Sequence, residues 1–244
     1  MAVPVARAAL TRGSSMRSLA PRLAEVRYLT FGRAVPAVLF ALLGYRVLGS
    51  LITQVRALPS PVRPIDVVAG PLPTALYFLF CALPVGLYLT RPRPRARDGR
   101  VVARAAGLVG TTMLLVVGAF PNPVLVVPPE WARTLATPLT IAAFTIAVYG
   151  LLHLRRNLSI IPEARRLVTG GPYRLVRHPL YLAEIVASMA VVLARPALWA
   201  LIALPVFIAV QLTRARFEER LLGRTFTEYA HYARRAWWPV PPAV

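Results

Sequence analysis

The stretch Ala136-Thr-Pro-Leu-Thr-Ile-Ala-Ala-Phe-Thr-Ile-Ala-Val-Tyr-Gly-Leu-Leu-His-Leu154 contains no Asp, Glu, Lys or Arg. A helix needs about 20 predominantly apolar residues to cross the hydrocarbon core of a bilayer. The whole chain of 244 residues has the same character: 57% of it is hydrophobic and only 16% is charged, which is too apolar for an ordinary soluble domain. We therefore predict that residues 136–154 form a transmembrane helix.

Further apolar runs lie on both sides of this stretch. The last two are shorter than the others and are separated only by Arg195-Pro196, which predicts a tight hairpin. The six predicted helices are 34–55, 67–89, 101–120, 136–154, 179–194 and 196–213. The sequence thus predicts an all-α, polytopic integral membrane protein with about six transmembrane helices.

The arginines give this protein a predicted orientation. All 29 basic residues are arginine, which indicates a GC-rich, bacterial genome. If the N-terminus is inside, the inner segments hold 24 arginines and the outer loops hold 4, with Arg46 left within a span. Because positively charged loops stay in the cytoplasm, we expect both termini there, in a multi-pass protein of the inner membrane. We divide the chain into a basic arm (1–33), a four-helix membrane region (34–154) and a motif-bearing region (155–244).

Composition also argues against several other classes of protein. The net charge of +20 arises from arginine blocks between apolar runs, without the aromatic interleaving typical of nucleic-acid binding, so anionic lipid headgroups are the expected counter-charge. Cys81 is the single cysteine, so neither a disulfide framework nor a thiolate metal site is predicted. The first 30 residues have no apolar core of a signal peptide, and we interpret them as an interfacial arm.

Two polar clusters stand out in the motif-bearing region. In the inner segment 155–181, a Gly170-Gly171-Pro172 turn is followed by Arg177-His178-Pro179 at the start of the fifth predicted helix. The free N–H groups of that helix start can bind an anion. After the sixth predicted helix come Arg214 and Glu218, which share one face if the helix continues past the membrane surface. We predict that these clusters carry the chemistry.

The same residues carry a family resemblance. The run Leu167-Val-Thr-Gly-Gly-Pro-Tyr-Arg-Leu-Val-Arg-His-Pro-Leu-Tyr181, followed by Glu218-Glu219 and a Tyr229-x-x-Tyr232 tail, resembles the isoprenylcysteine carboxyl methyltransferase family. The wider group includes membrane phospholipid methyltransferases. The likeness covers roughly 150–239, and the earlier spans share only their hydropathy with the family.

The resemblance implies a methyltransferase that uses S-adenosylmethionine. It implies that Arg214 faces the acceptor group of the substrate. The residues that it implies for binding the methyl donor are Leu167, Val168, Tyr173, His178, Pro179, Leu180, Tyr181 and Glu218. The tail departs from the family pattern, because Phe226-Thr227-Glu228 leads into Tyr229 one residue early and the usual Arg-Val-Pro-Arg is reduced to Arg234-Arg235-Ala236. No role is therefore assigned to Arg234 or Arg235.

The chemistry of the donor agrees with this assignment. S-adenosylmethionine carries a sulfonium and an ammonium beside a carboxylate, and Glu218 and the helix start at His178 offer the complementary charges. A carboxylate acceptor would need no general base, which fits a site in which the sequence places none. The acceptor stays open among a lipid, a lipidated molecule and a small lipophilic carboxylate, amine or thiol. Its tail is expected to enter laterally between helices.

Other interpretations remain at this stage. An NADPH-dependent membrane sterol-type double-bond reductase shares an Arg-His-Pro motif, although Leu180 replaces its asparagine, and a non-catalytic scaffold is also open. Glu219 is either a second functional carboxylate or a solvated helix end. Arg46 either pairs with Glu184 or lies nearer an interface. His153 and His231 are interpreted as structural.

Overall fold

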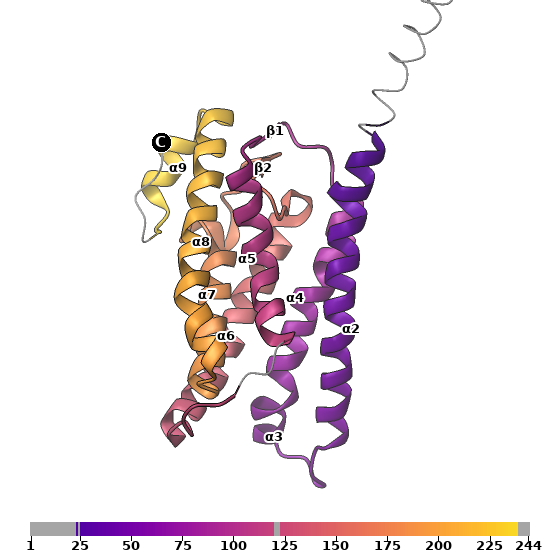
Figure 1. The fold of residues 1–244 in the computed structure, drawn as a ribbon, viewed down its shortest axis with the longest axis vertical. Coiled ribbons are helices and arrows are strands. Elements are labelled where there is room, and N and C mark those ends of the chain that lie inside the picture. Colours follow the sequence, from indigo (N-terminus) through magenta and orange to yellow (C-terminus); the bar gives the residue numbers. More distant parts are fainter. Residues whose placement is uncertain (1–22, 24, 120–122, 239–244) are drawn as a thin grey trace, which may run out of the picture.

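The computed structural model describes residues 23, 25–119 and 123–238, with no side-chain description for 114–119. Helices make up most of it (Figure 1). The long helices are α2 (Val35–Arg56), which continues a π-helical turn η1 (Tyr28–Ala34), α4 (Pro71–Thr90), α5 (Val101–Ala119), α6 (Glu130–Leu154), α7 (Pro179–Ala194) and α8 (Leu198–Thr225). The short elements are α3 (Pro64–Ala69), η2 (Arg155–Asn157), η3 (Gly171–Arg174), α9 (Tyr229–Arg235) and the two-residue strands β1 (Ala96–Arg97) and β2 (Glu163–Ala164).

The six predicted helices are confirmed, with three clear differences in their bounds. The helix predicted over 136–154 begins earlier, at Glu130. The helix predicted over 67–89 begins only at Pro71, because proline has no N–H to continue the hydrogen bonds of α3. The chain turns at Gly70 between the two helices, where a Cβ would lie only 2.9 Å from the Asp66 carbonyl oxygen. The helix predicted over 196–213 instead runs to Thr225. Arg214 and Glu218 are therefore both on α8, one turn apart. The hairpin at Arg195-Pro196 is as predicted.

Within the described residues, four helical segments are long and apolar enough to cross a membrane: Glu25–Arg56, Pro71–Thr90, Glu130–Asn157 and Leu198–Thr225. Two further apolar helices, Val101–Met113 and Pro179–Ala194, are shorter. The structure confirms an all-helical membrane protein, and the count of six crossings stays a prediction. Of the predicted arm 1–33, residues 1–22 lie outside the described residues, and 25–33 are helical.

Small residues let the helices pack closely. On α6, Ala143, Ala147 and Gly150 are buried at spacings of three and four residues, and α7 buries Ala183 and Ala187 in the same way. α6 and α7 make the most extensive helix pair in the bundle. Such spacing is typical of helices that associate in a membrane, where close backbone approach replaces the hydrophobic driving force.

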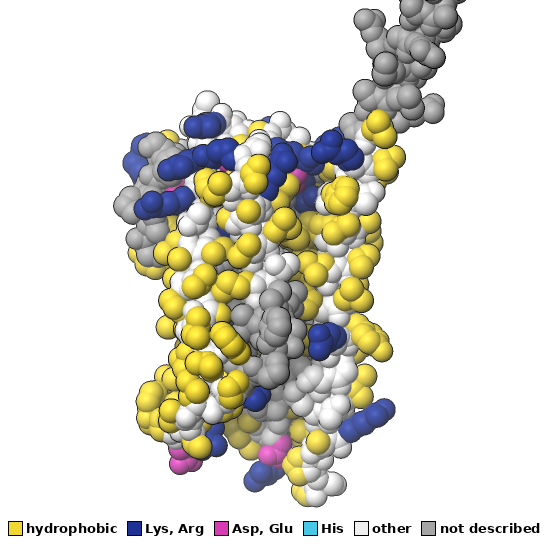
Figure 2. Space-filling view, viewed as in Figure 1, with side chains coloured by type: hydrophobic (Ala, Val, Ile, Leu, Met, Phe, Trp, Pro, Cys, Tyr) yellow, Lys and Arg dark blue, Asp and Glu magenta, His cyan; other side chains and the backbone are white. Residues whose placement is uncertain are grey.

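The surface divides into an apolar middle and a basic end. Figure 2 shows hydrophobic side chains along the length of the bundle and arginines gathered at the end that holds β1, β2 and α9. Large side chains such as Phe31, Tyr45 and Val206 are exposed, as expected for a lipid-facing surface. The basic end is the one that the arginine count assigns to the cytoplasm.

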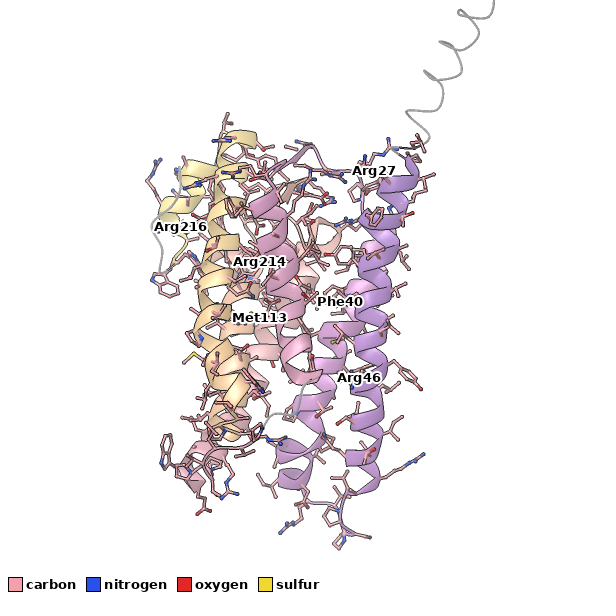
Figure 3. The ribbon with its side chains drawn as sticks, viewed as in Figure 1. Arg27, Phe40, Arg46, Met113, Arg214 and Arg216 are labelled. Atoms are coloured by element: carbon pink, nitrogen blue, oxygen red, sulfur yellow. The ribbon has the colours of Figure 1, made fainter. Side chains whose placement is uncertain are left out.

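Of the two alternatives for Arg46, the pairing with Glu184 is wrong. Arg46 is exposed on α2 (Figure 3), whereas Glu184 on α7 contacts Gln211 and Arg214. The sequence does not show which face of α2 packs against the other helices, so it could not show that Arg46 points away from α7.

Labelling of single cysteines tests the orientation. Val127 is 79% exposed, and Gly99 has no atom within 4 Å of an added Cβ, while the native Cys81 is fully buried. We expect a membrane-impermeant maleimide added to intact cells to label Val127→Cys but not Gly99→Cys, which should react only after the membrane is opened. Labelling of Gly99→Cys from outside would contradict the predicted sidedness.

Candidate active site

A cavity of about 110 Å³ opens near the basic end of the bundle. Its walls come mainly from the segment 155–181 and from α4, α6, α8 and α9, with single residues of α2 and α5 and Glu184 of α7. All nine residues that the resemblance implied line it: Leu167, Val168, Tyr173, His178, Pro179, Leu180, Tyr181, Arg214 and Glu218. Two sequence segments about 35 residues apart therefore meet around one space.

The two neighbouring glutamates on α8 have different environments. Glu219 is fully buried; its Oε1 accepts a hydrogen bond of 2.7 Å from Arg177 and lies 3.1 Å from His178 Nε2. Glu218 keeps 33% of its side-chain surface accessible and accepts a hydrogen bond of 2.9 Å from the Tyr181 hydroxyl. Glu219 thus holds the α7 start against α8, while Glu218 presents a carboxylate to the cavity. Glu219 is therefore not the solvated helix end that the sequence left as one alternative.

Removing the charge of Glu219 should destabilise the fold. Breaking a buried ion pair leaves its partner uncompensated, at a cost of about 3–5 kcal/mol. We expect Glu219→Gln to lose that much unfolding free energy, measured by denaturant or thermal unfolding in lipid nanodiscs. Glu228→Gln, at an exposed acid just past α8, is the matched control. Equal stability of the two variants would show that the Arg177 pair is not needed for folding.

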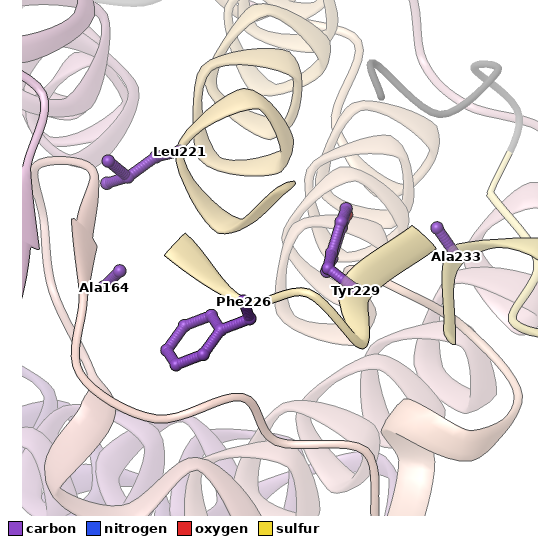
Figure 4. Packing of buried hydrophobic residues seen from close by; sticks show 5 residues of the cluster. All are labelled: Ala164, Leu221, Phe226, Tyr229 and Ala233. Carbon is purple, nitrogen blue, oxygen red and sulfur yellow. The ribbon is translucent and has the colours of Figure 1, made fainter. Parts of the chain in front are cut away.

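The C-terminal tail fixes the motif loop in place. Arg177 N–H donates to the Trp237 carbonyl at 3.0 Å, and Trp237 N–H donates to the Leu175 carbonyl at 2.7 Å. Tyr232 donates through its hydroxyl to the Tyr173 carbonyl at 2.9 Å. A small apolar core supports this arrangement (Figure 4), made by Ala164, Leu221, Phe226, Tyr229 and Ala233. The shortened tail therefore still packs against the loop.

Three tyrosines near the cavity stay protonated at neutral pH. Burial raises the pKa of Tyr173, Tyr229 and Tyr232, and the nearby carboxylate of Glu218 raises all three further. Their hydroxyls are consequently neutral hydrogen-bond donors, and their rings offer π-faces toward a cationic ligand.

Arg214 lies at the membrane side of the cavity and is 5% exposed. Its Nη1 donates to Gln211 Oε1 at 2.7 Å, and its guanidinium lies over the Tyr181 ring at 4.8 Å. A Cβ on Gly110 would come within 2.6 Å of Arg214 Cδ, so glycine is required there to admit the arginine. Tyr181 thus connects Arg214 on one side with Glu218 on the other.

Sequence reasoning missed a second charged cluster beside the cavity. The Glu163 carboxylate on β2 lies within 3.5 Å of Arg91, and within 2.6 Å of both Arg97 and Arg165. Burial alone would raise the pKa of this carboxyl, but Arg165 and Arg91 outweigh that effect, and the pKa lies below its ordinary value. The cluster connects the loop after α4 to the motif segment. The antiparallel β1–β2 pair that holds it is too short to leave an alternating pattern in the sequence.

A second, larger cavity lies beside the first in the apolar part of the bundle. Its volume is about 440 Å³, and it is lined mostly by apolar side chains. The lining residues come from α2, α4, α5, α6, α7 and α8. It shares Phe40, Phe80, Thr111 and Glu184 with the first cavity and reaches Pro73 at the opposite end of α4. The interval from Pro84 to Pro73 corresponds to roughly 16 Å along a helix. The space thus runs along the bundle.

Comparison with known proteins finds a similarity in this region. Residues 131–229 match the family model of phospholipid methyltransferases. The chain is also 34% identical over 110 residues to the cobalt-zinc-cadmium resistance protein CzcN of Cupriavidus metallidurans. That match covers 43% of this chain and 49% of CzcN, so the chain spans about half the length of this relative. The resemblance to the membrane methyltransferases, predicted from the 167–181 motif, is confirmed.

Proposed function

Because residues 131–229 match the phospholipid methyltransferases, we propose that this protein transfers a methyl group from S-adenosylmethionine to a lipophilic acceptor in the membrane. One observation carries the proposal. A small charged cavity, lined by all nine motif residues, lies next to a large apolar cavity within the bundle and shares four lining residues with it. A water-soluble donor and a lipid acceptor need such an arrangement to meet at one point.

The residues of the first cavity fit the donor. The accessible carboxylate of Glu218 suits its cationic groups, and the N–H groups at the start of α7, which begins with Pro179, suit its carboxylate. The rings of Tyr173 and Tyr181 can contact the adenine or the sulfonium. The cavity of about 110 Å³ is smaller than the roughly 300–1,000 Å³ typical of ligand pockets, so we expect the motif loop to shift outward on binding.

The donor supplies an activated methyl group, and the protein would hold the donor and the acceptor in position for the transfer. Glu218 and the start of α7 would hold the donor, while Arg214 would face the head of the acceptor, on the other side of Tyr181. Rate enhancement would come mainly from alignment of acceptor and methyl carbon, which can supply several kcal/mol, about 7–11 in model reactions.

The second cavity is the proposed site of the acceptor tail. Its volume of about 440 Å³ is within the usual range of ligand pockets, and its lining is chiefly apolar. A tail there lies along the helix axes. The acceptor is therefore expected to be a molecule with an extended hydrocarbon chain and one reactive head.

Ligand binding separates this function from the reductase alternative. We expect purified protein in nanodiscs to bind S-adenosylhomocysteine and to show no saturable binding of NADPH, measured by isothermal titration calorimetry. The family match favours this outcome. Binding of NADPH without S-adenosylhomocysteine would overturn the proposal, and binding of neither would favour the non-catalytic scaffold.

A further inference from the structure

Glu184 lies where the two cavities join. It is on the second turn of α7, it lines both cavities, and 27% of its side-chain surface is accessible. Acidic side chains within a membrane-spanning bundle are costly and generally functional. The sequence interpretation placed no proton acceptor in the site, so the position of this carboxylate is a finding of the structure.

The partners of Glu184 link it to the acceptor side of the site. The Gln211 amide donates to Glu184 Oε2, and the same oxygen lies 3.9 Å from Arg214 Nη1. Gln211 is fully buried and also accepts the hydrogen bond from Arg214. Glu184, Gln211 and Arg214 thus form one hydrogen-bonded triad.

Much of the hydrogen-bonding capacity of the Arg214 guanidinium is already used by protein groups. Beyond Gln211, its other amino group, Nη2, lies 3.4 Å from Thr111 Oγ1 and 3.5 Å from the Ile160 carbonyl oxygen. An acceptor carboxylate near Arg214 would therefore also lie near the Glu184 carboxylate. Like charges in a dry site repel strongly, and the charge of Arg214 is shared with Glu184. The geometry favours a head that brings no negative charge.

We propose that Glu184 accepts the proton of the acceptor nucleophile, and that the site selects a hydroxyl or a neutral amine over a carboxylate. This inference rests on the proposed function. The oxygen or nitrogen of the acceptor forms a bond to the methyl carbon, and its proton passes to the Glu184 carboxylate. The electron pair of the broken S–CH3 bond stays on the sulfur of the donor. Atoms and charges balance without a further reactant. Arg214 and Gln211 hold Glu184 in position.

Three probes with one tail and different heads test this inference: tetradecanol, tetradecylamine and myristate. Each is offered to the full-length protein in nanodiscs. One measurement is binding of the tritiated probe by scintillation proximity, with empty nanodiscs as the blank. The other is transfer of a labelled methyl group to the probe. Glu184→Gln removes the charge and keeps the shape. Glu130→Gln, at an exposed acid at the start of α6 that lines neither cavity, is the matched control.

We expect the wild type to methylate tetradecanol or tetradecylamine at least about tenfold faster than myristate. In Glu184→Gln, methyl transfer to the favoured probe should fall by about a hundredfold, as expected for loss of a general base. Binding of myristate should instead improve by about tenfold, because Arg214 then has no carboxylate beside it. A merely structural role for Glu184 would not improve binding of any probe. Glu130→Gln should behave as the wild type.

The outcomes separate this inference from the proposed function. Two outcomes overturn the role of Glu184 and leave the methyltransferase intact. In the first, the wild type binds the donor but prefers myristate over the other probes. In the second, a folded Glu184→Gln variant binds myristate no better than the wild type does. Absence of S-adenosylhomocysteine binding in the wild type overturns the methyltransferase itself and the role of Glu184 with it. Absence of binding of all three probes overturns the assignment of the second cavity to the acceptor tail, and the inference with it.

Discussion

Glu218→Gln is expected to weaken the binding of S-adenosylmethionine by about ten- to a hundredfold. The accessible carboxylate of Glu218 faces the cavity and already accepts a hydrogen bond from Tyr181. The change keeps the shape of the side chain and removes its charge. Loss of one charge-assisted hydrogen bond costs about 1.5–3 kcal/mol, which corresponds to that range of affinity. Calorimetric titration of the protein in nanodiscs measures it.

The control for this prediction is Glu228, an exposed residue that follows the C-terminal end of α8 in the sequence. Glu228→Gln removes the same charge and should bind the donor as the wild type does. His178→Ala should also weaken donor binding, but His178 contacts the buried Glu219, so its effect includes a change in stability. If Glu218→Gln is folded and binds S-adenosylmethionine with unchanged affinity, the donor does not occupy the part of the cavity lined by Glu218.

Arg214→Lys is expected to lower turnover by about a hundredfold or more while changing donor affinity by less than about threefold. The guanidinium contacts Gln211 and lies over the Tyr181 ring, a planar geometry that an ammonium cannot reproduce. A misplacement of about 1 Å at the reacting centre can cost on the order of a hundredfold in rate. Single-turnover transfer of a labelled methyl group measures the rate, and calorimetry measures the affinity.

Lysine is the informative replacement because it keeps the positive charge. If Arg214 served only to retain α8 at the cytoplasmic surface, lysine would serve equally well. Full activity of Arg214→Lys would therefore assign it to topology. Loss of donor binding in proportion to the loss of turnover would move Arg214 to the donor half of the site. Arg216→Lys, two residues along on the same helix, is the control, because Arg216 is exposed and lines neither cavity.

Hydropathy and motif spacing predicted much of this protein. Each transmembrane helix needs its own apolar run, so helices such as α6 and α7 could be located in the sequence before any contact was known. The 167–181 motif and Glu218 could be placed in one site because the family resemblance gives both their positions. The structure brings them around one cavity.

The contacts between helices could not be predicted in the same way. Glu184 had one candidate partner in the sequence, Arg46, but the packing of α7 against α8 gives it Gln211 and Arg214 instead. Neighbouring residues on a helix point about 100° apart, so the rotation of α8 about its axis decides whether Glu218 or Glu219 faces the cavity. That rotation is set by the helices packed against α8, which residue spacing alone does not show. The apolar cavity is likewise a property of packing, because its walls come from six helices.

The most direct test of the proposed activity follows the methyl group itself. Membranes that contain the protein are incubated with S-adenosylmethionine labelled in its methyl group, and the lipid extract is separated and counted. We predict a labelled lipophilic product that forms with the wild type and is lost with Glu218→Gln. A wild-type protein that binds the donor but leaves the lipid extract unlabelled would contradict a methyltransferase acting on a membrane acceptor.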